Sequence, residues 1–341
     1  MAKPPTVEDV ARVAGVSRQT VSNVLNSPHV VRDETRERVQ RAITELAYRP
    51  HAAARRLRTR RSSTIGIHLD PYSGGISGVI LDRFVHALTE RASERGMRVL
   101  IYGARSAEEE IARLGDLVDG AEIDAVVITG TFFGDPRTGW LLDRGVPFVS
   151  FGRPWGGEDV YRSEHTWVDV DGAAGTRAAT RHALATAGRR VGFFGWPAGS
   201  GTGDDRERGW RGAMADAGAI GPRFEANDGL AVARVVMSAA FAEPGVLRDL
   251  DALVCVSDSH AVGAHLAAAD AGRRDLPVIG FDNTPVAEAL GISSVEQSPE
   301  LVAAAVLNFL MGTDGHAVAP RDSGMPLEHV LVEPRLIVRA Y

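Results

Sequence analysis

Apolar residues near the start of the chain recur at spacings of three and four, which is the period of an amphipathic helix. The first such stripe consists of Val7, Val10, Ala11 and Ala14. Thr6 can cap this helix, and Gly15 supplies the left-handed conformation that a sharp helix end requires. Ser17 can cap a second helix, whose inner face consists of Val21, Val24 and Leu25. A third apolar stripe within residues 33–46 completes a small all-α domain, which we expect to span residues 1–49.

The second helix directs polar side chains away from this core. An arginine fork, and amides that pair a donor with an acceptor, are the groups that read base edges in the major groove. Two helices joined by a tight turn, with such residues on the second, form the helix-turn-helix arrangement. We therefore expect a DNA-binding head, and a merely solvated polar face is the alternative interpretation. The candidate DNA contacts of the head are Thr6, Ser17, Arg18, Gln19, Thr20, Ser22 and Asn23.

Residues 50–62 form a connector that is too short to fold alone. Its helix-prone part, 51–58, is about two turns long, whereas an isolated helix needs roughly 12 to 15 residues in water. Small alanines permit close approach to a narrow groove, arginines meet phosphates, and Leu57 is an apolar wedge of the kind that unstacks a base step. We expect the connector to become helical on DNA, with contacts at Ala54, Arg55 and Leu57.

In these segments the sequence resembles the LacI/GalR family of bacterial transcription repressors. The resemblance covers nearly the whole chain, and its motifs are Val7-x-Asp9-Val10-Ala11, Ala14-Gly15-Val16-Ser17-x-x-Thr20-Val21-Ser22, Thr35-Arg36 and Tyr48-x-Pro50. It implies that the positions of Arg18, Gln19 and Asn23 face bases in the major groove. It also implies that Leu57 enters the minor groove at the central step of a near-palindromic operator. His51 departs from the family, which commonly has asparagine there.

Charge is divided unevenly along the 341 residues. Residues 1–61 carry 13 Lys+Arg against 6 Asp+Glu, a balance of +7, although the whole chain has a formal net charge of -6. A basic head on an acidic body binds polyanions at one end only. We find no signal-peptide pattern and no long apolar run, and therefore expect a cytoplasmic protein. The lone Cys255 lies in an apolar run and is expected to be a buried small hydrophobe.

From residue 63 onward, apolar runs of strand length alternate with segments of helical periodicity. The predicted strands are 64–69, 98–102, 125–128, 146–151, 191–194, 253–256 and 278–281, and the predicted helices are 76–95, 172–187, 204–217 and 261–271. Such alternation specifies an α/β region with doubly wound parallel sheets. We expect two subdomains with a cleft between them, the first comprising about 63–162 and 292–322, the second about 163–291 and 323–341. The resemblance implies that 63–341 is a periplasmic-binding-protein-like domain for effector binding and dimerisation.

Ligands of open parallel sheets bind beyond the carboxyl ends of the strands, so the residues that follow each strand are the candidates. Carboxylates that accept hydroxyl hydrogens, an arginine that donates, and aromatic rings together favour a carbohydrate-type site. The candidate effector-binding residues are Asp70, Arg153, Trp155, Arg206, Ser257, Asp258, Phe281 and Asp282. Helix capping is the alternative role for Asp258 and Asp282. The resemblance implies that Arg206 and Asp282 contact a sugar.

Motifs of enzymes and cofactor sites are missing from the sequence. We find no phosphate-binding loop, no dinucleotide fingerprint and no zinc-helix spacing, and therefore expect no cofactor, no metal and no catalysis. Three functions stay open: a homodimeric repressor released from its operator by a sugar, a repressor with a nucleobase corepressor, and a sugar-binding protein with a vestigial head. We favour the first. No leucine heptad follows residue 339, so a dimer and not a tetramer is expected.

Overall fold

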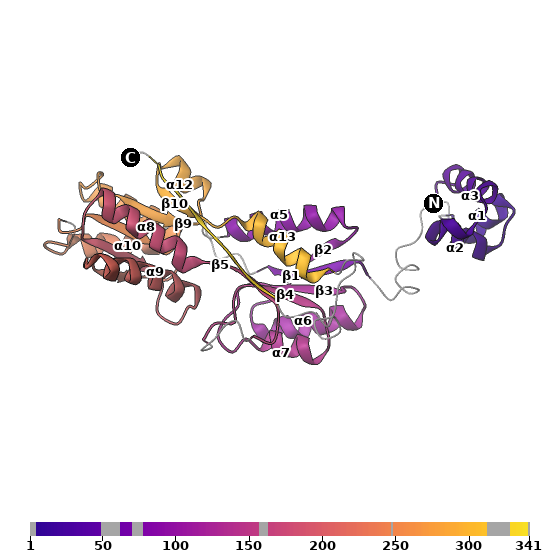
Figure 1. Ribbon diagram of the computed structural model, residues 1–341, viewed down its shortest axis with the longest axis horizontal. Coiled ribbons are helices and arrows are strands. Elements are labelled where there is room, and N and C mark those ends of the chain that lie inside the picture. The colour runs from indigo at the N-terminus through magenta and orange to yellow at the C-terminus, as the bar shows by residue number, and fades with distance from the viewer. Residues whose placement is uncertain are drawn as a thin grey trace. The chain divides into compact units, whose positions relative to one another are not determined.

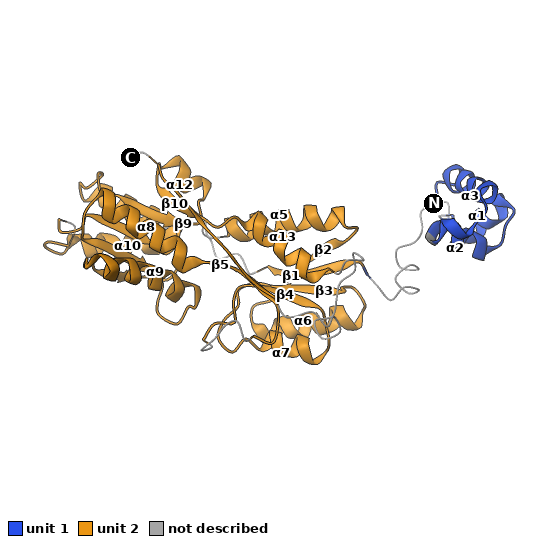
Figure 2. Ribbon diagram, viewed as in Figure 1, with its two compact units in different colours: residues 1–62 blue, residues 63–341 orange. Residues whose placement is uncertain are grey.

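A computed structural model describes residues 5–48, 62–69, 78–156, 163–246, 248–311 and 328–339. It divides into two compact units, Met1–Ser62 and Ser63–Tyr341 (Figure 2). The predicted connector contacts Ala54, Arg55 and Leu57 and the predicted ligand residue Asp70 lie outside the described residues. Among the described helices, none combines the length and the apolar character that crossing a bilayer requires.

The first unit is a helical miniature domain, as the apolar spacing predicts. Its elements are α1 (Val7–Ala14), α2 (Arg18–Asn26), the short 3-10 helix η1 (Pro28–Val30) and α3 (Asp33–Glu45). Thr6 caps α1 in a reciprocal pair with Asp9, and the capping hydrogen bonds lower the pKa of Asp9 to about 2. Gly15 ends α1 with a φ of 64°, in the left-handed region, and Ser17 caps α2.

The core of this unit confirms most of the predicted inner face. Its buried residues are Val10, Ala11, Ala14, Val21, Val24, Val39 and Ala42. Leu25 is an exception, because 37% of it is exposed. Val21 and Val24, three residues apart, set the inward direction of α2, and the next residue points about 100° away from it. The prediction that Leu25 belongs to the inner face is therefore wrong.

The second unit contains two six-stranded sheets (Figure 1). The first has the order β11-β5-β4-β3-β1-β2, and every pairing in it is parallel. Its strands are β1 (Thr64–Leu69), β2 (Arg98–Gly103), β3 (Ala125–Ile128), β4 (Phe148–Phe151), β5 (Trp167–Val170) and β11 (His329–Val332). The second has the order β12-β10-β9-β8-β6-β7, in which only β12 pairs antiparallel, with β10. Its strands are β6 (Val191–Gly195), β7 (Arg223–Glu225), β8 (Ala252–Cys255), β9 (Val278–Phe281), β10 (Ser293–Glu296) and β12 (Arg335–Ile337).

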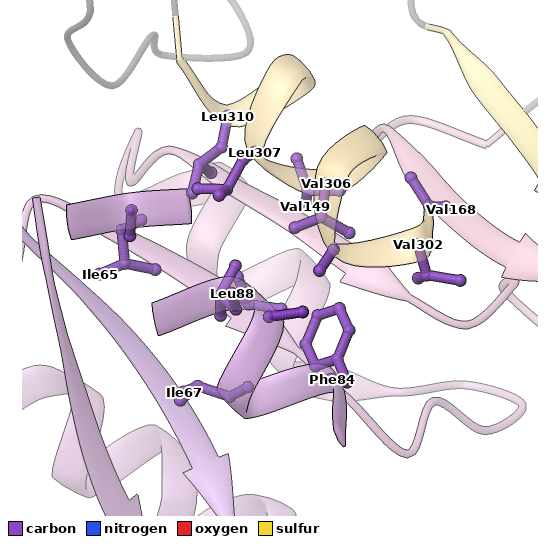
Figure 3. Close-up of a cluster of buried hydrophobic side chains, with 14 of the residues drawn as sticks. Ile65, Ile67, Phe84, Leu88, Val149, Val168, Val302, Val306, Leu307 and Leu310 are labelled. Carbon is purple, nitrogen blue, oxygen red and sulfur yellow. The ribbon is translucent and has the colours of Figure 1, made fainter. Parts of the chain in front are cut away.

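Helices cover both faces of each sheet, which explains why the central strands β3, β8 and β9 have no polar side chains. The helices of the first sheet are α5 (Val79–Glu94), α6 (Ala107–Asp119), α7 (Pro136–Asp143) and α13 (Pro299–Leu310). Those of the second are α8 (Gly172–Thr186), α9 (Thr202–Ala217), α10 (Leu230–Ala242), α11 (Asp258–Asp270) and α12 (Pro285–Ala289). On one face of the first sheet, α5 and α13 pack together. Figure 3 shows the buried cluster to which Phe84 and Leu88 of α5 and Val302 and Val306 of α13 belong. Cys255 is fully buried in β8, as predicted.

The limits of the two halves differ from those expected. The strand β5 joins the first sheet although the expected limit was about 163, and β10 joins the second although 292–322 was expected in the first half. The strand β11 returns to the first sheet, and β12 ends in the second. The chain therefore crosses between the halves after β5, after β10 and after β11. Apolar runs predict a strand, but they do not say which sheet will accept its backbone hydrogen bonds.

Candidate DNA interface and candidate ligand cavity

The outward face of α2 is exposed and polar, as the sequence predicts. Arg18 and Gln19 are exposed, and Asn23 is half-buried. Arg18 Nη1 lies 2.9 Å from Glu8 Oε1, and Gln19 Nε2 donates to Asn23 Oδ1 at 3.0 Å. Solvent-exposed pairs of this kind contribute roughly 0 to 1 kcal/mol. These side chains are therefore held lightly and can exchange their partners for base edges.

The capping residues of the head have defined structural roles. Thr6 donates its hydroxyl hydrogen to Asp9 Oδ2 at 2.8 Å and accepts from the Asp9 backbone N–H. Ser17 accepts from the Thr20 backbone N–H at 3.1 Å, and the two hydroxyl oxygens lie 2.9 Å apart. Ser22 is half-buried on the same helix. The DNA contacts expected at these four residues stay predictions.

Arg18→Ala should relax base choice at one operator position per half-site by about 1 to 3 kcal/mol, because a bidentate contact to a base edge would be lost. An operator is first recovered by selection from random duplexes. Operator variants with one changed base pair then compete with it for the protein, and their relative affinities are measured. Arg12→Ala is the matched control, since Arg12 is also exposed and pairs with Asp9 at 3.0 Å, but lies on α1. An equal loss of affinity for all operator variants would assign Arg18 to the phosphates.

A cavity of about 370 Å³, the inner cavity, is lined by both halves of the second unit, next to the carboxyl ends of the strands. The first half lines it with Ile80, Leu81, Thr129, Gly130, Thr131, Phe151, Gly152, Arg153, Trp155, Asp169 and Val170. The second half adds Gly172, Trp196, Thr202, Asp205, Arg206 and Gln297. Its volume is within the roughly 300 to 1,000 Å³ of small-molecule sites. Of the predicted ligand residues, Arg153, Trp155 and Arg206 are brought together here.

Arg206 presents a buried guanidinium at the wall of the inner cavity. Its Nη1 donates to the Val256 carbonyl at 2.6 Å, and its central carbon lies 3.7 Å from the centroid of the Phe281 ring. Burial lowers the pKa of Arg206, yet an arginine keeps its charge in proteins. The buried Nε has no hydrogen-bond partner. A buried donor without a partner is costly, so a ligand oxygen in the cavity would gain a charged hydrogen bond.

Arg153 links the two halves across the inner cavity. It follows β4 in the first half, and its Nε donates to Asp169 Oδ2 of β5 at 2.7 Å. Its Nη2 donates to Asp205 Oδ2 of α9, in the second half, also at 2.7 Å. Asp205 also accepts from the backbone N–H of Ala173 at 3.0 Å. This buried ion pair therefore joins α9 and the start of α8 to the first sheet.

Trp155 makes a second contact between the halves. The Arg153 guanidinium lies 4.6 Å from the centroid of the indole. On the other half, a Cβ built on Gly201 would lie 2.5 Å from Trp155 Cγ, and Gly201 has a φ of 63°. Only glycine suits this position on both counts. The Trp155 ring therefore contacts both halves and lines the inner cavity.

Asp282 lies behind the cavity wall and is not among the lining residues. Its Oδ1 accepts from Gln297 Nε2 at 2.6 Å and lies 3.7 Å from Arg206 Nη1. Burial raises the pKa of Asp282 to about 8. Its φ of 116° is unusual for a residue with a side chain, and such strain is typical of functional sites. In this structure Asp282 orients the two side chains that do reach the cavity.

Three other predicted ligand residues do not line the inner cavity either. Ser257 is the N-cap of α11 and donates to Asp228 Oδ1 at 3.1 Å. Asp258 is fully buried and accepts from the Thr284 backbone N–H at 2.7 Å and from the Ser294 hydroxyl at 2.6 Å. Phe281 packs under the Arg206 guanidinium. The cap proposed as the alternative role of Asp258 is supplied by Ser257 instead. Asp258 ties α11 to Thr284, which follows β9, and to Ser294 within β10.

Several cavity residues were missed by the sequence analysis, above all Asp169, Asp205 and Gln297. Asp205 directly precedes Arg206 after β6, so the same strand-end rule could have found it. Asp169 lies within a strand, and Gln297 follows β10, a strand that was not predicted. Trp196 was not among the candidates either, yet its ring lies 5.6 Å from the Arg206 guanidinium and lines the cavity.

Ser257, His260 and Asp228 come together, but not as a catalytic triad. His260 Nδ1 lies 3.3 Å from Ser257 Oγ and 3.7 Å from Asp228 Oδ1, while Nε2 lies 3.2 Å from the Ala226 carbonyl oxygen. A triad needs the serine and the carboxylate on opposite ring nitrogens. Within the described ranges, His, Cys, Asp and Glu form no group of three that could hold a metal ion.

The comparisons with known proteins agree with this architecture. The family model for bacterial regulatory proteins of the lacI family matches residues 6–51, and a model for a periplasmic binding protein-like domain matches 180–340. The HTH-type transcriptional regulator CelR of Thermobifida fusca is 33% identical over 329 residues, covering 90% of this chain and 91% of CelR. A solved complex of the transcriptional regulator CelR with cellobiose is 28% identical, with a TM-score of 0.69 over 98% of this chain and 99% of that one.

A structure of the lac repressor dimer bound to operator and the anti-inducer ONPF has the same fold, with a TM-score of 0.81 and 23% identity over 99% of this chain and 98% of that one. The chain belongs to the lacI family of bacterial regulatory proteins. It is a helix-turn-helix transcriptional regulator with a periplasmic-binding-protein-like domain, which confirms the predicted family and fold class.

Proposed function

We propose that this regulator is a homodimeric repressor that works in the cytoplasm and is released from a palindromic operator by a saccharide. The observation that carries the proposal is the buried Arg206, whose Nε lacks a partner at the wall of a cavity lined by both halves. The carboxylates of Asp169 and Asp205 and the rings of Trp155 and Trp196 supply acceptors for hydroxyl hydrogens and apolar faces for sugar rings. The complex of the relative CelR with cellobiose also supports a saccharide.

The coupling between saccharide binding and operator binding would arise from the contacts that cross the inner cavity. A saccharide that borders Arg153 and Arg206 touches both halves, so its affinity depends on the angle between them. A ligand shifts a conformational equilibrium only by its difference in affinity for the two states, typically about 1 to 3 kcal/mol. In a dimer, two heads would bind two half-sites of one operator. A change of angle that moves the heads apart would weaken operator binding about 5- to 150-fold.

The experiment is fluorescence anisotropy of a labelled operator with the full chain, in the presence of mono- and oligosaccharides and of nucleobases. We expect at least one saccharide to weaken operator binding. A nucleobase that strengthens binding, with no saccharide effect, would favour the corepressor alternative. Operator affinity should fall with salt by about 0.9 log units per phosphate contact and per log unit of salt. Affinity without salt dependence would indicate a vestigial head.

A further inference from the structure

A second pocket, the outer pocket, opens directly beside the inner cavity. It has a volume of about 380 Å³ and shares Thr131 and Trp155 with the inner cavity. Its apolar lining includes Phe132, Phe133 and Pro154, and its described wall belongs to the first half alone. The two spaces together are roughly twice the inner volume, and Trp155 stands at their junction.

Two aromatic rings of the outer pocket are exposed and lie outside the hydrophobic core. Phe132 is 45% exposed and Phe133 is 74% exposed, whereas the other nine phenylalanines are buried or half-buried. Exposing two neighbouring rings forgoes the hydrophobic stabilisation that burial of each would give. Adjacent exposed rings beside a pocket are typical of a binding surface.

Both rings are nevertheless held in defined positions. A Cβ built on Gly156 would lie 2.2 Å from Phe133 Cδ2, so this ring rests directly on the Gly156 backbone. The Arg137 guanidinium lies 5.7 Å from the centroid of the Phe132 ring. Arg137 is itself buried, and its Nη1 donates to Glu110 Oε2 at 2.7 Å. A fixed platform loses little side-chain entropy when a ligand binds.

We propose that the outer pocket is a second saccharide subsite, so that the effector is an oligosaccharide whose chain runs from the inner cavity past Trp155 onto Phe132 and Phe133. This inference rests on the proposed function, because it assigns a further part of the same ligand. Sugar rings offer apolar C–H faces to aromatic rings and hydroxyl groups to the rim, where Thr138 and the exposed Glu164 lie. A single sugar ring could not occupy both spaces at once.

The test is calorimetric titration of the full chain with glucose, maltose and cellobiose and with malto- and cello-oligosaccharides of up to about four units. Within the series that binds, we expect the Kd to fall about ten-fold from the shortest member that binds to the longest, which corresponds to about 1.4 kcal/mol. Phe133→Ala should remove most of this gain and leave the Kd of the shortest member unchanged. Because Phe133 is exposed, this substitution should cost the fold little.

Ile220→Ala is the matched control, because Ile220 is 76% exposed in the second half and lies outside both lining sets. It should leave the affinity of every member unchanged. An affinity that does not depend on saccharide length would overturn the second subsite, and so would a gain in affinity with length that survives Phe133→Ala. Release of the operator by a short saccharide would still support the proposed function. If no member binds, the second subsite fails, whereas the proposed function fails only if no saccharide of the wider panel releases the operator.

Discussion

Replacing Arg206 with leucine is expected to abolish the effect of a saccharide on operator binding and to leave operator binding itself intact. The reason is the position of this guanidinium, which is buried at the cavity wall with a free Nε–H. A hydrogen bond to a charged group contributes roughly 1.5 to 3 kcal/mol, so each one lost would weaken ligand binding about 10- to 150-fold. The head is a separate compact unit, so its affinity for DNA should not depend on this side chain.

Two further variants make this result interpretable. Arg211→Leu is the matched control on the same helix, since Arg211 is exposed and pairs with Glu207, and it should keep the full response. Arg206→Lys keeps the charge but not the planar fork, and should respond weakly. Operator anisotropy with and without the saccharide measures the response, and thermal melting reports on the fold. A normal response of a folded Arg206→Leu protein would remove Arg206 from the ligand site.

Asp282→Asn is expected to stabilise the protein increasingly as the pH rises. Burial raises the pKa of the Asp282 carboxyl from 3.8 to about 8. Between these values the folded protein keeps a proton that the unfolded chain has released, so the wild-type free energy of unfolding falls with rising pH. Asparagine does not titrate. The stability difference between variant and wild type should therefore grow by up to about 1.4 kcal/mol per pH unit within this window.

Urea unfolding of both proteins at intervals from about pH 5 to about pH 8 measures this difference. Asp275→Asn serves as the control, because the Asp275 side chain is 75% exposed beside Arg273. Its stability difference from the wild type should change little over the same range. A flat difference for Asp282→Asn would show that its carboxyl is ionised in the folded protein throughout, as a strong ion pair with Arg206 would require.

Much of the fold follows from residue pattern alone. Helix caps such as Thr6 and Ser17 and the apolar runs of the central strands carry strong local signals, and the structure confirms them. The edge strands β7, β11 and β12 have only three or four residues each and are mostly half-buried, so their apolar runs are too short to predict a strand. Their place in either sheet depends on pairing with strands far away in the sequence. The local sequence does not encode that choice.

The ligand site, like the fold, could be predicted from the sequence in part. The strand-end rule placed Arg153, Trp155 and Arg206 at one cavity, because the ends of parallel strands meet at one edge of a sheet. The same rule also selected Ser257 and Asp258, whose side chains instead bond to Asp228, Thr284 and Ser294 inside the second half. Position after a strand is visible in the sequence, whereas the direction of a side chain depends on partners such as Ser294. Phe132 and Phe133 of the outer pocket gave no signal of this kind in the sequence.

The late return of the chain to the first sheet has a consequence for biosynthesis. While a ribosome makes this protein, the first sheet stays without its edge strand β11 and its helix α13 until almost all of the second half has been translated. Neither half corresponds to one continuous stretch of polypeptide, so neither can be excised as an independently folding fragment. Domains that must wait for distant segments expose unpaired strand edges in the meantime. In the nascent chain, the edge of β5 that pairs with β11 is therefore the expected site of aggregation until residues 329–332 have been translated.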